Sequence, residues 1–125
     1  MGLSLAEMGA QVLNTADGRA KTALSLQYSQ AWQEARAAGN TLEIGTAPAP
    51  DHPARPEAPR LCAPKDVAKR KPGSPEGRIA LLHAVAHIEL NAVDLHWDII
   101  VRFSETRLPT GFFDDWVQAA AEESK

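Results

Sequence analysis

The sequence lacks most of the features that assign a function directly. Its single cysteine, Cys62, cannot form an internal disulfide, which suits a reducing compartment. A net charge of -3 leaves no basic stripe for phosphate contacts, which argues against nucleic acid as a partner. The sequence has no signal-peptide pattern, no apolar run long enough to span a membrane, and no Ser-His-Asp arrangement, glycine-rich phosphate loop or CxxC pair. These absences predict a soluble cytoplasmic protein, and 125 residues allow one domain at most.

The longest apolar-periodic run, Gly77–Phe103, predicts the central helix. Ser74, Pro75 and Glu76 precede it as an N-cap, a first helical residue and a first-turn acid. At about 100° per residue, Glu89 lies in the middle of an apolar arc. That arc holds Leu82, Val85, Ala86, Val93, His96, Ile100 and Phe103, and the opposite arc holds His83, His87, Asn91, Asp94 and Asp98. The pattern predicts that Glu89 is buried, and a buried carboxylate needs a proton, a polar partner or a metal.

Two helices are predicted in residues 1–45, the N-terminal helical segment. Ser4 and Glu7 form a capping box that starts a short helix, which ends near Asn14–Gly18. Asp17 caps a longer helix over Arg19–Ala38. The predicted apolar face of this helix comprises Ala20, Leu24, Tyr28, Ala31, Trp32 and Ala35.

Residues 46–75 form a proline-rich segment that contains eight of the nine prolines. Proline at this density disfavours helix and favours extended chain. The segment is either a solvated linker or a strap that packs Leu61, Cys62 and Val67 against the helices. Its basic cluster, Lys65 to Lys71, is either a solvated charge run or a phosphate or RNA contact.

A last helix is predicted over Phe112–Lys125, after a short connection and Pro109. Its apolar face carries Phe112, Trp116, Ala119 and Ala120, with Glu123 among them. Short connections join antiparallel neighbours, so this helix and the central one should form a hairpin that brings Glu89 and Glu123 together. The sequence stops at Lys125 without a capping signal, which predicts a truncated chain.

Two inward carboxylates on facing helices can ligate iron or manganese, share a proton, or pair with a cation. His96 lies two turns from Glu89 on the same side, where it could support a ligand without binding the metal itself. His83 and His87 have a zinc-binding spacing but lack the glutamate of an HExxH motif.

A resemblance to a known family covers the whole chain. It rests on EGRIALLHAVAHIELNAVDLHWDIIVRF and LPTGFFDDWVQAAAEESK, and also on SLAEMGAQVL, AWQEARAAG and RPEAPRLCAPKDVAKRKPGSPEGR. These segments resemble an uncharacterised bacterial ferritin-like family, domain of unknown function 455. In ferritin-like proteins the first bundle helix supplies one Glu and the second supplies Glu-x-x-His. The resemblance implies that Glu89 is the first-helix ligand and Glu123 the second-helix glutamate; the histidine would follow Lys125, and the second helix pair is absent.

The prediction is therefore an all-α protein in which residues 76–125 form the first half of a ferritin-like four-helix bundle. The complete bundle would hold a di-metal carboxylate centre of iron or manganese for oxygen-dependent oxidation or hydroxylation. A likeness to ferritin-like tRNA hydroxylases admits a modified nucleoside as substrate. This chain would be inactive alone, or hold no metal, and would form a homodimer or bind a partner with the missing helices. The alternative is a non-catalytic helical interaction module.

Overall fold

A computed structural model describes residues 3–40, 42–55, 74–106 and 108–124, without the side chains of Ala80, His83 and Ala84. These residues form four α-helices and no strand, which confirms the all-α prediction. The helices are α1 (Leu5–Leu13), α2 (Gly18–Ala37), α3 (Pro75–Arg102) and α4 (Thr110–Glu123). Within the same residues, no helix has the length and apolar character that crossing a membrane requires.

The predicted helix starts are confirmed by their capping contacts. The Ser4 hydroxyl accepts a hydrogen bond from the Glu7 backbone N–H, and the Glu7 carboxylate accepts one from the Ser4 N–H. Asp17 caps α2 through the Ala20 N–H, and Ser74 caps α3 through the Gly77 N–H. Each cap satisfies a backbone donor that the helix itself leaves free, so these short motifs determine where the helices begin.

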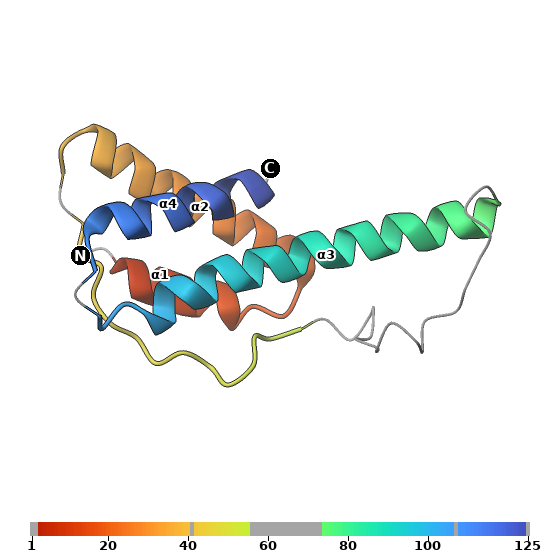
Figure 1. The fold of residues 1–125 in the computed structure, drawn as a ribbon, viewed down its shortest axis with the longest axis horizontal. Helices are drawn as coiled ribbons and strands as arrows, with labels where there is room; N and C mark the ends of the chain where they lie inside the picture. The colour runs from red at the N-terminus through yellow and green to blue at the C-terminus, as the bar shows by residue number, and fades with distance from the viewer. Residues whose placement is uncertain (1–2, 41, 56–73, 107, 125) are drawn as a thin grey trace.

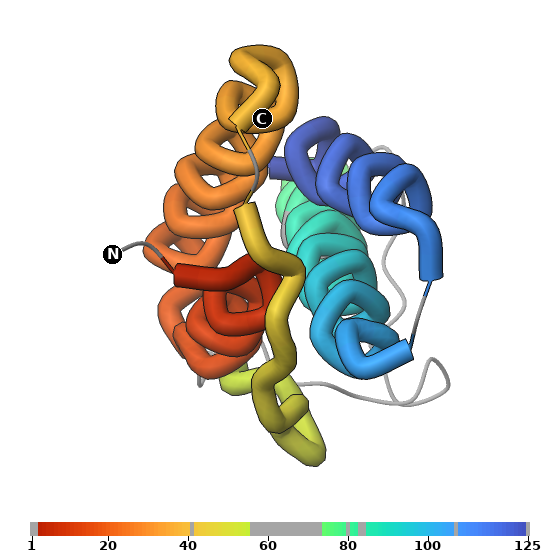
Figure 2. The backbone as a smooth tube through the Cα atoms, turned by 90° about the vertical axis from the view of Figure 1, so that its left-hand side faces the viewer, coloured from red at the N-terminus to blue at the C-terminus, as the bar shows by residue number. Residues whose placement is uncertain are grey.

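The four helices enclose one core. Going around it, α1 contacts α3, α3 contacts α4, α4 contacts α2, and α2 returns to α1. Figure 2 shows this arrangement end-on, with α1 and α2 on one side and the α3–α4 hairpin on the other. The buried apolar core comprises Leu5, Val12, Leu13, Trp32, Val93, Trp97, Ile100, Val101, Phe113, Val117 and Ala120. The two N-terminal helices therefore cover one face of the hairpin.

Residues 42–55, which contain the start of the proline-rich segment, pack along the helices as a strap. The Glu43 and Ile44 carbonyls accept hydrogen bonds from the first two N–H groups of α1, at 2.9 and 2.8 Å. Ala47 and Ala49 contact the core, and the Pro50 carbonyl accepts from Arg102 of α3. The strap thereby supplies partners to backbone donors at the start of α1. The predicted anchors Leu61, Cys62 and Val67 and the basic cluster Lys65 to Lys71 lie outside the described residues.

The buried face of α2 differs from the predicted one. Its buried residues are Lys21, Ser25, Ser29 and Trp32, whereas Ala20 is exposed and the other predicted residues except Trp32 are only half-buried. The face is rotated by about one residue toward a small, polar stripe. Serine is tolerated there because its hydroxyl finds partners: Ser29 donates to the Leu26 carbonyl, and Ser25 accepts from Trp97 of α3 at 2.7 Å.

The N-terminal half of α3 projects beyond the other three helices (Figure 1). Large apolar side chains on this arm are exposed: Ile79 by 57%, Leu81 by 59%, Leu82 by 68%, Val85 by 44% and Ile88 by 66%. Farther along, Leu95 of α3 and Phe103, the residue after α3, are exposed too. A row of large exposed apolar residues on one helix marks an interaction surface.

Candidate functional site

The relative register of α3 and α4 is set by aromatic contacts along the hairpin. The rings of His96 and Trp116 lie with their centroids 5.5 Å apart. Nearer the turn, Phe103, which follows α3, meets Phe112 of α4 edge to face at 6.4 Å. Together these contacts show that α3 and α4 run side by side as an antiparallel hairpin.

Glu89 and Glu123 lie in the same direction from the His96–Trp116 contact. Glu89 precedes His96 by seven residues on α3, and Glu123 follows Trp116 by seven on α4. Because the helices are antiparallel, both steps lead about 10.5 Å in the same direction along the hairpin. The two glutamates therefore lie in the same part of the hairpin, beyond the aromatic contact.

The prediction that Glu89 is buried is wrong. Glu89 and Glu123 are both exposed, whereas Asp94, placed on the opposite arc, is 3% exposed. The helical wheel was misleading because α3 is apolar around most of its circumference, so more than one face could be buried. One arc, with Val93, Trp97, Ile100 and Val101, packs into the core, and the arc through Leu82, Glu89 and His96 lies beside it. Glu89 is now of interest because it lies in the same part of the hairpin as Glu123, and not because it is buried.

His96 is half-buried and lies two turns from Glu89 along α3. Its Nδ1 atom is buried and has no hydrogen-bond partner among the described residues. Burial lowers the pKa of His96, while the nearby negative charge of Glu123 raises it in part. The electrostatic influence of Glu123 agrees with the register drawn from the aromatic contacts. A supporting role for His96 at a metal stays a prediction.

The donor set fits a hard metal in chemistry and position, but not in number. Carboxylate oxygens suit iron and manganese, and adjacent bundle helices are a usual source of them. In the part of the chain that the structure describes, no three His, Cys, Asp or Glu side chains lie close enough together to hold a metal ion. Glu89 and Glu123 would therefore need further ligands from elsewhere. The His83 side chain is outside the described residues, so the zinc alternative with His87 stays a prediction.

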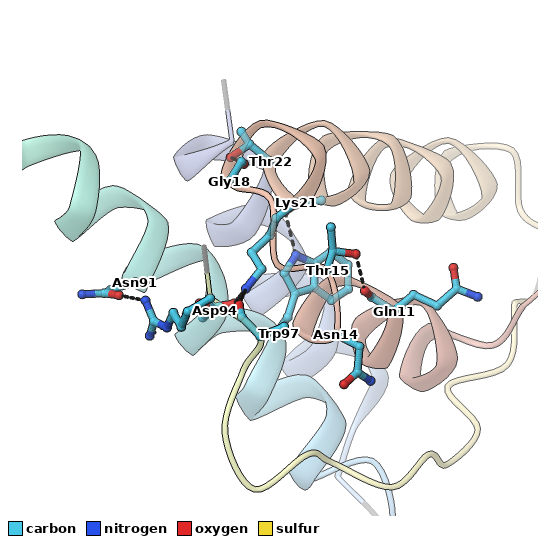
Figure 3. A network of polar contacts seen from close by, with 12 residues as sticks. Gln11, Asn14, Thr15, Gly18, Lys21, Thr22, Asn91, Asp94 and Trp97 are labelled. Atoms are coloured by element: carbon cyan, nitrogen blue, oxygen red, sulfur yellow. Dashed lines mark hydrogen bonds and ion pairs between the residues drawn. The ribbon is translucent and has the colours of Figure 1, made fainter. Parts of the chain in front are cut away.

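A second polar centre, which sequence reasoning missed, joins α2, α3 and the strap (Figure 3). Lys21 of α2 is fully buried, and its Nζ atom donates to Asp94 Oδ1 of α3 at 2.6 Å and to the Ala54 carbonyl at 2.6 Å. Arg55 lies 3.6 Å from the other Asp94 oxygen and donates to Asn91. A buried charge is tolerated when it is both paired and hydrogen-bonded, as Lys21 is here.

The electrostatics of this centre are dominated by dehydration. Burial raises the pKa of Asp94, against the lowering effects of the Lys21 hydrogen bond and of the Lys21 and Arg55 charges. Lysine and aspartate side chains usually lie in solvent, so a helical wheel places both residues outside the core. The one available signal was the spacing of the small Ser25 and Ser29 with Trp32, which continues back to Lys21 on the same face of α2.

Other polar contacts hold α4 against α2. Asp114 accepts hydrogen bonds from Trp32 Nε1 at 2.7 Å and from the Arg36 guanidinium through both of its oxygens. At the other end of α4, the Ser124 hydroxyl lies 2.7 Å from the Ser25 hydroxyl. These contacts fix the position of α4, and with it the position of Glu123.

The described residues form an all-helical fold whose α3–α4 hairpin carries two exposed glutamates. The chain belongs to the family described as protein of unknown function (DUF455), whose sequence model matches residues 14–125. It is 49% identical over 74 residues to an uncharacterized protein of Haemophilus influenzae. That match covers 55% of this chain but 26% of the relative, so the chain corresponds to a fraction of the relative's length. No solved structure matches the chain.

Proposed function

We propose that the α3–α4 hairpin contributes Glu89 and Glu123 to a ferritin-like di-metal carboxylate centre of iron or manganese. The activity of the complete centre is an oxygen-dependent oxidation or hydroxylation. This chain supplies part of the ligand set and is inactive alone.

The observation that supports the proposal is the position of the two glutamates, which both lie beyond the His96–Trp116 contact in the same part of the hairpin. Carboxylates from adjacent bundle helices are a usual source of metal ligands. Both glutamates are exposed, so further ligands can reach them. A bound iron or manganese pair would supply redox chemistry with oxygen that amino acid side chains lack.

The remaining residues of the site have supporting tasks. Ser25 and Asp114 hold α4 in place, while the core contacts of Val93 and Trp97 hold α3. His96 and Trp116 hold the two helices together two turns from the glutamates.

Manganese titration followed by electron paramagnetic resonance tests the proposal, because bound Mn²⁺ loses the sharp signal of the free ion. Glu89→Gln and Glu123→Gln should each weaken binding by about tenfold or more, since even the loss of a residue that only orients a ligand has an effect of this size. Glu122→Gln is the matched control, because Glu122 is also exposed and adjacent in sequence. Equal binding by all four proteins, or none by the wild type, would refute the proposal.

The second candidate is a non-catalytic helical interaction module. The observation that favours it is the exposed apolar arm of α3, which would serve a binding partner whether or not a metal is present. Such a module would keep its partner after both glutamates are replaced by glutamine. A modified tRNA nucleoside stays a candidate substrate of the complete enzyme, and the cytoplasm stays the predicted compartment.

A further inference from the structure

We draw no further inference here: the strongest candidate, the exposed apolar face on the projecting half of α3 with Leu81, Val85 and Ile88, is an unpartnered surface, and nothing in the structure shows what covers it.

Discussion

Lys21 and Asp94 are oppositely charged side chains that the core encloses almost completely. Their side chains are 0 and 4% exposed, and the bond between them links α2 to α3. Removing one member of such a pair leaves the other charge dehydrated without compensation. This pair therefore makes the packing of α2 on α3 sensitive to a single change.

Asp94→Asn should lower the free energy of unfolding by about 3–5 kcal/mol, because it leaves the Lys21 ammonium buried without a counter-charge. Lys21→Met combined with Asp94→Leu should recover most of this loss. Asp98→Asn is the control, since Asp98 is four residues away and pairs with Arg102 in solvent, where about 0–1 kcal/mol is expected. Urea unfolding measures the three variants against the wild type. A loss below about 1 kcal/mol for Asp94→Asn would show that the buried pair contributes little.

His96 should make the stability of the metal-free protein fall in weak acid. Burial lowers its pKa in the folded state below the ordinary 6.5, so the unfolded chain binds the proton more readily. The contribution of neutral His96 to the free energy of unfolding is complete above pH 6.5. It is lost as the pH falls through the pKa of His96 in the folded state. We expect His96→Gln to reduce this pH dependence, measured as urea midpoints between pH 7.5 and 5.5 in a chelating buffer. His52→Gln, at an exposed position, is the control. Identical slopes for wild type and His96→Gln would contradict the assignment.

The helices of this protein differ in how far their sequence determines them. Their starts were predictable because Ser4, Asp17 and Ser74 act locally, through side-chain bonds within three residues. Their buried faces were not predictable, because the buried face of a helix depends on which other elements pack against it. Glu89 was predicted inside and Asp94 outside, and the reverse holds. When a helix is apolar on most sides, a helical wheel does not show which side is buried.

Replacing Gly45 in the strap should destabilise the protein more than replacing Gly39, which lies in the turn between α2 and the strap. Both glycines have positive φ, 63° and 76°, so alanine would be strained at either position. A Cβ at Gly45 would also come within 2.5 Å of Ser4, whereas Gly39 has open space around it. Gly45→Ala should therefore be destabilised more than Gly39→Ala, by about 1–3 kcal/mol in thermal or urea unfolding. Equal losses would show that the strap moves away from Ser4 without loss of stability.

At the scale of the whole molecule, the hairpin has two apolar sides, of which one is covered. Helices α1 and α2 and the strap cover the side with Val93, Trp97 and Val117. Leu81, Val85 and Ile88 on the projecting half of α3 remain exposed. The sequence predicted the all-α class and the helix limits to within about two residues, whereas the role of the two glutamates stays a prediction. The small bundle formed with α1 and α2 was not predictable, because its α2 face is built from Lys21 and serines that have no apolar periodicity.

The most direct test of the carboxylate site is an anomalous difference map from crystals grown with Mn²⁺. The account predicts a peak between the side chains of Glu89 and Glu123, within coordination distance of both. The same map from Glu123→Gln crystals should lack the peak. A map of the wild-type protein with no peak there, or with manganese only at other exposed acids such as Asp115 and Glu122, would contradict the carboxylate site.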